Sequence, residues 1–462
     1  MIAQKKDIPV VKLFMEKNRF FLYDAGNNQL FQISKEFYIE VKNLLKLGVS
    51  EYLLNVSDKK EYFDVCALIK RGYFKDQLFE GYKNRDEEYI PRLLERCISD
   101  LQLQVSRACN FKCRYCSFAG DNNIGRSHEN INMSWNVAKQ SIDFLYDHSK
   151  DMPEVFIYFY GGEPLLNYEL IKQSVNYAKS RFLSKRIIFG VTTNCSILNA
   201  DMIDFFAQND FIFTISFDGE RQIQDSHRRF LRNGNGTYDV VINNINMIRN
   251  KFAEFYQRNV RFNVVSFVDE DKRLVYDYFS KILDKKNNHI NLINPDTRGI
   301  DYYYDKVAYA NEYANYKESE NFQKEYKVFL DAYYNKIQLN TKWYDCGGCI
   351  AGAQRLFVSV DGSFYPCEKV PEIPVVSIGS LSSGFDFKQV LRVTNAPCVS
   401  QDKCCRCWAA RFCSMCVCYC VDSVSQSICA EAKMLHCQEN LRKAEKMLKE
   451  YVNSIDCSGG IR

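Results

Sequence analysis

The sequence lacks the segments that would direct a chain into or across a membrane. No apolar run approaches the roughly 18 residues that a membrane-spanning helix needs. The first residues, MIAQKKDIPVVK, contain no apolar stretch like that of a secretory signal peptide. The formal net charge is only +4 over 462 residues, which indicates neither nucleic-acid nor membrane binding. These absences predict a cytoplasmic protein with no nucleic-acid or membrane partner.

Cysteine, in contrast, is abundant and unevenly distributed. Of 20 cysteines, 14 lie between Cys346 and Cys457, and seven of those lie between Cys404 and Cys420. Disulfides do not persist in a reducing cytoplasm, so cysteine crowding there indicates metal binding or catalysis. The alternative is a secreted disulfide scaffold, which does not suit a chain this large without a signal peptide.

The cysteines near residue 110 carry the most specific chemistry. Cys109, Cys113 and Cys116 have the spacing Cx3Cx2C, and thiolates are the usual ligands of iron–sulfur clusters. Three thiolates on a [4Fe–4S] cluster leave one iron open, and an open coordination site is where metal chemistry takes place. The alternatives are a structural zinc knuckle and a set of reduced core thiols, but zinc normally takes four ligands.

The first 85 residues have a different character. Residues 8–33 alternate apolar and polar side chains around a turn at 24–28, which predicts short strands and a hairpin. Ser34 is expected to begin a helix that ends at Gly48, and a second helix is expected over about 57–71. Such a small winged-helix-like module has no cysteine cluster or phosphate loop, which indicates docking rather than chemistry. The alternative is a structural cap on the main domain.

From about residue 101 the pattern changes to a repeated strand, loop and helix. The apolar strand candidates are 101–105, 155–159, 187–191, 211–217, 260–267 and 290–293. Helical periodicity lies between them, over 134–148 with Ser134 as its N-cap, 168–182 and 238–252. The alternation predicts an α/β fold with a parallel sheet that is closed or partly closed into a barrel. The cysteine triplet and several polar motifs follow the strands, at the end where such barrels place their chemistry.

Two further motifs complete a family resemblance. Tyr115 precedes the last cysteine of the triplet, and Gly161-Gly-Glu-Pro164 follows one strand–helix unit later. The combination resembles the radical S-adenosylmethionine (SAM) superfamily, and the cysteine-rich last third resembles its SPASM domain, which holds auxiliary clusters. The resemblance covers roughly residues 101–440 and implies a partial (β/α)6 TIM-like barrel. The expected domains are a precursor-peptide recognition element (1–85), the radical SAM barrel (86–300), a bridge (301–345), the SPASM domain (346–440) and a C-terminal helix and tail (441–462).

The resemblance also implies a SAM site on a [4Fe–4S] cluster held by the triplet. Its expected SAM-binding residues are Tyr115, Gly161, Gly162, Glu163, Asn194, Ser216 and Arg228. In the family pattern Tyr115 packs near the adenine, Glu163 accepts from the SAM ammonium, and Arg228 pairs with its carboxylate. Cys195 stands where the family has glycine, which puts the role of this loop in doubt. For Ser216 and Asp218 the alternative is a simple strand-end turn.

The cysteine-rich third is expected to hold two auxiliary [4Fe–4S] clusters. By resemblance the ligands are Cys346, Cys349, Cys367 and Cys416 for the first cluster, and Cys404, Cys407, Cys413 and Cys429 for the second. Cys418 is the second choice for Cys416, because Val417 occupies the usual position of that ligand. Cys437 is the reserve for Cys429. Zinc ribbons are the alternative for the whole region, since paired Cx2C spacings serve zinc equally well.

Glu368 follows Cys367 directly. In the related sulfatase-maturing enzymes a carboxylate at this place is the proposed catalytic base, so the resemblance implies that role for Glu368. Proton removal is useful where loss of a hydrogen atom, a proton and an electron completes an oxidation. The alternative is a solvated turn residue.

The resemblance as a whole implies a maturase of ribosomally made peptides of the thioether-forming (sactipeptide, ranthipeptide) group. It would form C–S crosslinks in a cysteine-rich precursor peptide through a 5′-deoxyadenosyl radical. The expected partners are the precursor, whose leader binds residues 1–85 as an added strand, and an electron donor such as flavodoxin or ferredoxin. The alternatives are an anaerobic sulfatase-maturing enzyme, a C–C crosslinking maturase and a non-catalytic metal-binding interaction protein.

Overall fold

The computed structural model places most of the chain. It describes residues 6–81, 87–116, 128–265, 272–285, 289–293, 349–353, 355–413, 415–422 and 424–456. The expected bridge over 301–345, the expected ligand Cys346 and the extreme C-terminal tail lie outside these residues. Within them, no helix is both long enough and apolar enough to cross a membrane.

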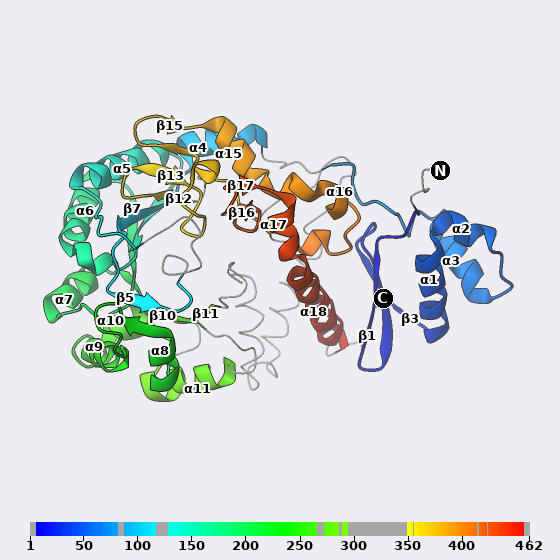
Figure 1. The fold of residues 1–462 in the computed structure, drawn as a ribbon, viewed down its shortest axis with the longest axis horizontal. Helices are drawn as coiled ribbons and strands as arrows, with labels where there is room; N and C mark the ends of the chain where they lie inside the picture. The colour runs from blue at the N-terminus through cyan, green and yellow to red at the C-terminus, as the bar shows by residue number, and fades with distance from the viewer. Residues whose placement is uncertain are drawn as a thin grey trace.

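The N-terminal module is a three-stranded antiparallel sheet followed by helices (Figure 1). Its elements are β1 (Val11–Glu16), β2 (Arg19–Asp24), β3 (Gln29–Ile33), α1 (Lys35–Leu47), α2 (Val49–Leu54) and α3 (Lys60–Lys70). The Ser34 hydroxyl accepts from the Phe37 backbone N–H (3.1 Å), and Gly48 ends α1 at a φ of 87°. The predicted hairpin and two helices are confirmed. The winged-helix-like identity of the module stays a prediction.

The main domain is built on one large, mostly parallel sheet. Its parallel strands are β4 (Asp100–Ser106), β6 (Glu154–Gly161), β7 (Arg186–Thr193), β8 (Ile212–Ser216), β10 (Val260–Val265) and β11 (Ile290–Ile293). All six predicted strands are confirmed. Strand β12 (Arg355–Val358) joins in parallel beside β4, so the chain returns to the sheet from its cysteine-rich part. The antiparallel strands β13 (Ser363–Tyr365), β14 (Gly379–Ser380) and β15 (Gly384–Phe385) extend that edge.

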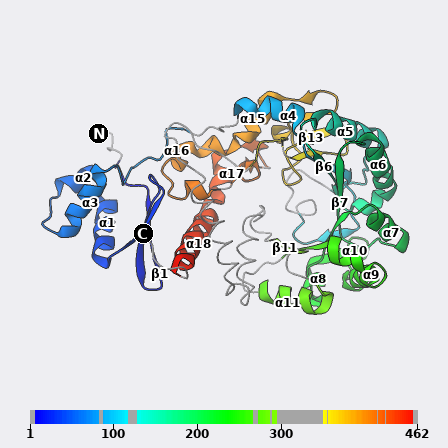
Figure 2. The same ribbon diagram turned by 180° about the vertical axis from the view of Figure 1, so that it is seen from behind.

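Helices cover the outer face of the curved sheet, as Figures 1 and 2 show. They are α4 (Ile90–Arg96), α5 (Trp135–His148), α6 (Tyr168–Arg181), α7 (Ala200–Gln208), α8 (Arg221–His227), α9 (Tyr238–Lys251), α10 (Ala253–Asn259) and α11 (Lys272–Leu283). The alternation along the strands explains the layering. In β6, Val155, Ile157 and Phe159 are buried in the core. Tyr158 and Tyr160, which alternate with them along the strand, lie on the opposite, inner face. The predicted helices α5, α6 and α9 are confirmed.

The cysteine-rich region has short elements and one long terminal helix. They are α15 (Phe387–Thr394), α16 (Gln401–Cys404), β16 (Val421–Asp422), β17 (Ser427–Ile428), α17 (Ala430–Leu435) and α18 (Cys437–Asp456), with 3-10 turns at Pro374–Val376, Ala396–Ser400, Ala410–Phe412 and Val417–Tyr419. Short elements bury little apolar surface, so this part of the fold relies on contacts between loops.

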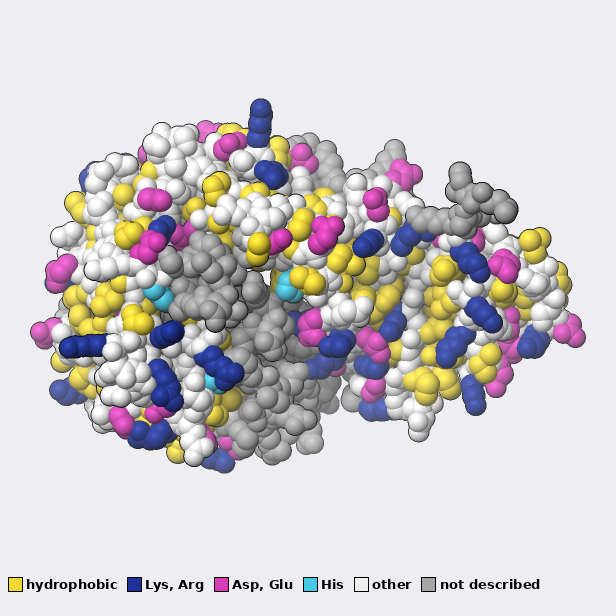
Figure 3. Space-filling model, in the orientation of Figure 1, with side chains coloured by type: hydrophobic (Ala, Val, Ile, Leu, Met, Phe, Trp, Pro, Cys, Tyr) yellow, Lys and Arg dark blue, Asp and Glu magenta, His cyan; other side chains and the backbone are white. Residues whose placement is uncertain are grey.

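The N-terminal sheet is buried on both faces. One face packs on α1 and α3 through Leu22, Val41 and Leu44. The other face, which includes Phe21, packs against Phe412 of the cysteine-rich region and against residues of α18. Figure 1 shows α18 beside β1, and Figure 3 shows abundant apolar side chains over the module. The module is therefore joined to the cysteine-rich region by a shared core rather than by a linker alone.

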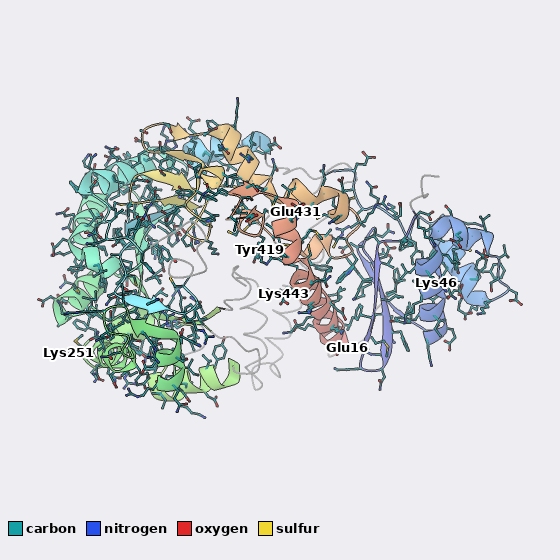
Figure 4. The ribbon with its side chains drawn as sticks, in the orientation of Figure 1. Glu16, Lys46, Lys251, Tyr419, Glu431 and Lys443 are labelled. Carbon is teal, nitrogen blue, oxygen red and sulfur yellow. The ribbon has the colours of Figure 1, made fainter. Side chains whose placement is uncertain are left out.

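Polar contacts extend this junction. Lys12 pairs with Glu445 of α18 (2.5 Å), and Arg406 pairs with Asp76 (3.1 Å). The Leu78 backbone N–H donates to the Cys405 carbonyl (2.8 Å). At the far end of α18, the Asn453 amide donates to Glu16 (2.9 Å), which Figure 4 labels beside that helix. The contacts of Arg406 and Cys405 bind the module to the loop that carries Cys404, Cys407 and Cys413, and those of Lys12 and Glu16 bind it to α18.

We expect Phe21→Ala to loosen this junction. Phe21 is fully buried and stacks on Phe14, with ring centroids 5.2 Å apart. Truncation of a buried phenylalanine costs about 3–5 kcal/mol. Native-state hydrogen exchange should show the loss as faster exchange of the β2 amides. In the matched control Leu54→Ala, whose side chain is 83% exposed, protection should change by no more than about 0.5 kcal/mol. Equal protection in the two variants would contradict a shared core.

Candidate functional site

The triplet loop leaves the carboxyl end of β4. Its middle forms a short strand, β5 (Phe111–Cys113), which pairs antiparallel with β9 (Arg228–Phe230). In that register Cys113 lies opposite Arg228. Two predicted site residues more than one hundred positions apart are therefore brought together by backbone pairing.

Nitrogen donors lie beside two of the three sulfurs. The Phe111 backbone N–H donates to Cys109 Sγ (3.4 Å), and the Asn194 amide lies 4.0 Å from the same sulfur. An Arg228 guanidinium nitrogen lies 4.0 Å from Cys113 Sγ. Burial raises the pKa of Cys109 to about 12 and that of Cys113 to about 11, although the Arg228 charge opposes the latter shift. N–H groups directed at sulfur stabilise thiolates, so the environment suits metal-bound cysteines.

Gly161 and Gly162 are required by the backbone of the triplet loop. A Cβ on Gly161 would lie 2.1 Å from the Ser106 carbonyl oxygen, and one on Gly162 would lie 2.4 Å from the Ala108 carbonyl oxygen. The Gly162 and Glu163 N–H groups donate to these two carbonyls (2.9 and 2.8 Å). The close approach observed is thus between two protein loops, where the sequence predicted an approach to a ligand.

Glu163 is fully buried, and protein donors already contact both of its carboxylate oxygens. It accepts from the Thr193 hydroxyl (2.6 Å), the Asn194 backbone N–H (2.6 Å) and the Leu165 backbone N–H (3.1 Å). Burial raises its pKa to about 7, against these hydrogen bonds. Glu163 therefore ties the loop after β6 to the loop after β7. Its contact with a SAM ammonium stays a prediction.

The loop after β7 preserves the backbone expected of a glycine. Cys195 is buried at a φ of 59°, in the left-handed region that favours glycine. Asn194 donates to the Asn110 side chain (2.8 Å) and accepts from the Ser196 hydroxyl (2.6 Å). The departure from the family pattern at Cys195 therefore leaves the loop in place beside the triplet.

Asp218, just after β8, connects several predicted residues. Its carboxylate accepts from the Tyr115 hydroxyl (2.6 Å), from Arg228 Nε (3.0 Å) and from the Val265 backbone N–H (3.0 Å). Burial opposes its ionisation, but the Arg228 charge and these donors hold the pKa of Asp218 below its usual value. The guanidinium also lies over the Tyr115 ring, 5.2 Å from its centroid. Ser216, at the end of the same strand β8, pairs in register with Asn263 of β10.

Glu368 lies in an ion-paired group at the other end of β4. Its carboxylate faces Arg355 (3.3 Å), which also donates to Asp100 (3.1 Å) at the start of that strand. Burial raises the pKa of Asp100 to about 6, against the Arg355 charge. Glu368 is thus a paired and largely buried residue, which disagrees with a solvated turn.

The first set of auxiliary cysteines is partly assembled. The Cys349 thiol is close enough to those of Cys367 and Cys416 for their charges to interact. Cys418 interacts with both Cys367 and Cys416, and a hydrogen bond from Cys418 lowers the pKa of Cys416 to about 7. Both predicted candidates for the crossing ligand, Cys416 and Cys418, therefore lie in this set.

The second set contains Cys404, Cys407, Cys413 and Cys437, which all lie within range of one another's charges. The reserve residue Cys437 thus belongs to the group. Cys429 is the first choice for the fourth ligand from the sequence. Its contact is with Cys420, whose carbonyl accepts from the Cys429 backbone N–H (2.8 Å). Which of the two is the fourth ligand stays a prediction.

Sequence reasoning missed two residues beside the triplet. His128 Nε2 lies 3.5 Å from Cys116 Sγ, and its Nδ1 lies 3.1 Å from the Arg107 carbonyl oxygen. The buried Glu372 side chain accepts from Arg107 (2.8 Å) and from Gln104 (2.5 Å), at the carboxyl end of β4. Neither belongs to a spaced motif, so no signal in the sequence marks them.

The residues present fit iron–sulfur clusters better than single ions. Within the described ranges, no group of three or more histidine, cysteine, aspartate or glutamate residues is arranged to hold one metal ion. Thiolates of a [4Fe–4S] cluster bind separate irons and need not converge. Three sulfurs, two of them beside N–H donors that include an arginine, meet the needs of such a cluster with one open iron.

Comparison with known proteins agrees with this geometry. The radical SAM superfamily matches residues 103–265. The cysteine-type anaerobic sulfatase-maturating enzyme of Clostridium novyi is 23% identical over 59% of this chain and 74% of its own. The radical SAM cyclopropyl synthase TigE of Paramaledivibacter caminithermalis is 25% identical over 59% of this chain and 58% of its own. The solved structure of native anSMEcpe with bound AdoMet superposes with a TM-score of 0.54 at 20% identity, covering 77% of this chain and all of that one.

Some curated relatives are matched over less than two thirds of their own length. An uncharacterised protein of Methanocaldococcus jannaschii is 31% identical over 141 residues, which is 30% of this chain and 46% of that protein. The structural likeness, at 20% identity, concerns the fold: a mixed α/β architecture with a large, mostly parallel sheet.

We expect Asp218→Asn to destabilise the main domain, because it leaves the buried Arg228 guanidinium without its carboxylate. Breaking a buried ion pair from one side costs about 3–5 kcal/mol. The matched control is Asp239→Asn, whose partner Arg221 and own side chain are mostly exposed; it should cost no more than about 1 kcal/mol. Urea unfolding followed by circular dichroism measures both. Equal midpoints would show that the buried pair contributes little to stability.

Proposed function

Since residues 103–265 form a radical SAM domain, we propose that this radical SAM enzyme matures a ribosomally made, cysteine-rich peptide by forming thioether (C–S) crosslinks. The chain is homologous to sulfatase-maturating enzymes and to a radical SAM cyclopropyl synthase. The observation that supports the finer proposal is the packing of the N-terminal module on the cysteine-rich region, which would join a peptide-binding element to the expected auxiliary clusters.

The module has one kind of surface suited to a peptide. Both faces of its sheet are buried, as described above, so an extended peptide can join only at an edge. In the described residues β3 is an edge strand that pairs with β2 alone. A leader peptide that added beside β3 would continue the antiparallel sheet through main-chain hydrogen bonds. A solved structure of anSMEcpe holds AdoMet and the Cp18Cys peptide (TM-score 0.51), which supports SAM and a peptide as ligands here.

When bound, the cluster and SAM would supply the one-electron chemistry that removes a hydrogen atom from the peptide. Cys109, Cys113 and Cys116 would hold that cluster. Asp218 orients Arg228, and the guanidinium nitrogen near Cys113 would then pair with the SAM carboxylate. Asp218 also fixes Tyr115 through its hydroxyl, and the ring would pack near the adenine.

The remaining predicted contacts depend on the same loops. Gly161, Gly162 and Glu163 hold the loop after β6 against the triplet loop, and Asn194 holds the loop after β7. Glu163 acts here by holding the loops after β6 and β7 in position, and its backbone lies beside the triplet loop. Ser216, at the end of β8, would contact the SAM ribose.

Glu368 is proposed as the group that takes the proton released when the peptide thiol closes the crosslink. Its carboxylate pairs with Arg355 (3.3 Å), which also donates to Asp100 (3.1 Å). The auxiliary clusters would be held by Cys346, Cys349, Cys367 and Cys416, and by Cys404, Cys407 and Cys413 with Cys429 or Cys437. The electron left by the crosslink would pass to an auxiliary cluster, and a flavodoxin or ferredoxin would supply the radical SAM cluster.

The main alternative is an anaerobic sulfatase-maturating activity, which the 23% identity to the Clostridium novyi enzyme favours. A separate leader-binding module has no use in that reaction, so the docked N-terminal sheet favours the peptide maturase. A C–C crosslinking maturase would use the same machinery.

The decisive experiment searches the neighbouring reading frames for a short cysteine-rich peptide and uses it as the substrate. The anaerobically reconstituted protein, with SAM and dithionite, should remove two hydrogens per crosslink from the peptide and leave fewer thiols open to alkylation. A peptide that lacks its leader should react far more slowly. Loss of two hydrogens with every thiol retained would indicate a C–C crosslink, and loss of the sulfur itself would indicate formylglycine. Cys113→Ala should form no 5′-deoxyadenosine, whereas Cys97→Ala should behave like the unchanged protein.

Glu368→Gln tests the proposed base. A general base contributes about 10²–10⁴-fold, so crosslinking should fall by that factor while SAM is still cleaved. The control is Asp100→Asn, which removes the other carboxylate on Arg355 and should reduce turnover much less. Equal loss in the two variants would show that the ion-paired group acts only by holding Arg355.

A further inference from the structure

A buried lysine is directed at the second set of cysteines. Lys433, on α17, is only 1% exposed. Its ammonium donates to Cys404 Sγ (3.3 Å) and to the Pro397 carbonyl oxygen (2.5 Å). Figure 4 labels Glu431, two residues earlier on the same short helix. A lysine this deeply buried requires a reason, because an ammonium in a protein interior costs several kcal/mol unless it meets negative charge.

The cysteine that Lys433 contacts has a second partner. The Ser400 hydroxyl lies 3.2 Å from Cys404 Sγ, at the end of the turn that contains Pro397. Pro397 holds the ammonium from one side, and Cys404 accepts from the other. The charges of Cys413 and Cys420 also act on Lys433. The fold therefore directs the ammonium into the cysteine set, where thiolates bound to a metal centre would supply negative charge.

Hydrogen bonds and positive charge near cluster sulfurs set the reduction potential of iron–sulfur clusters. A cluster with four thiolate ligands is an anion, and reduction adds one further negative charge. A fixed ammonium beside a ligand stabilises the reduced state more than the oxidised state. Its effect is strongest where water is excluded, as it is at Lys433.

We propose that Lys433 is a positioning residue for electron transfer. Its ammonium, through Cys404, raises the reduction potential of the second auxiliary cluster. The inference rests on the proposed function. In a crosslink, the peptide loses a hydrogen atom to the adenosyl radical, a proton to a base and one electron, as its C–H and S–H bonds are replaced by a C–S bond. The second cluster, held by Cys404, Cys407 and Cys413, would accept that electron and be reduced by one unit, and the Lys433 charge would favour the transfer.

Redox titration followed by electron paramagnetic resonance tests the proposal. All variants carry Cys109→Ala, Cys113→Ala and Cys116→Ala, so that only auxiliary clusters contribute signals. Lys433→Met should move one of two potentials downward by at least about 59 mV, which is a tenfold change in the reduced-to-oxidised ratio for one electron. Lys433→Arg keeps the charge and should remain near the parent value. The matched control Lys403→Met removes an exposed lysine next to the same cysteine and should shift the potential much less.

The outcomes separate this inference from the proposed function. If the parent protein binds no iron after reconstitution, the auxiliary clusters themselves are absent and the proposed function fails. If Lys433→Met binds as much iron as its parent and titrates at the same potentials, the lysine has no redox role. Equal shifts in Lys433→Met and Lys433→Arg would assign the effect to packing and overturn the proposal. Loss of about four irons from Lys433→Met alone, with Lys433→Arg intact, would support it, because the anion then needs the ammonium to bind.

Discussion

The buried pair of Asp218 and Arg228 is the interaction on which the candidate site most depends. It joins the end of β8 to β9, and through β9 to the strand that contains Cys113. The same carboxylate fixes Tyr115 and the end of β10. Such a pair costs desolvation and stabilises the fold only when its hydrogen bonds are satisfied, as they are here by three donors. Its value therefore lies in orientation, because it sets the positions of an arginine and a tyrosine relative to the sulfurs.

A second constraint concerns the cysteine-rich loop over residues 404–413. Cys404, Cys407 and Cys413 are expected to hold a cluster. Cys405, Arg406 and Phe412 contact the N-terminal module. One short loop thus serves two neighbours. Since a segment with so little regular structure is ordered largely by its contacts, binding of metal and docking of the module are expected to support each other. This arrangement would link the proposed peptide-binding module to the part of the chain that would handle electrons.

The two proposals use charge in the same way. Arg355 holds Asp100 and Glu368 at one end of β4, and Lys433 is held between Pro397 and Cys404. In each case a cation is fixed by the fold before any ligand arrives, so little reorganisation is needed when charge develops. The proton transfer proposed for Glu368 and the electron transfer proposed for the second auxiliary cluster would both take place beside a cation that the fold holds in position.

The sequence by itself determined the elements and the triplet. Apolar alternation located all six parallel strands, and Ser34, Gly48 and Ser134 marked helix ends, because periodicity and capping are local properties. The spacing of Cys109, Cys113 and Cys116, together with Tyr115, the Gly161-Gly-Glu-Pro164 motif and the cysteine-rich third, carried the family resemblance for the same reason. Only the tertiary structure decided which distant residues meet: Glu163 with Thr193, His128 with Cys116, Cys437 with Cys404, and Lys433 with Cys404. It also decided that Gly161 and Gly162 make room for the triplet loop. Contacts between residues far apart in the chain depend on packing, and no local pattern records them.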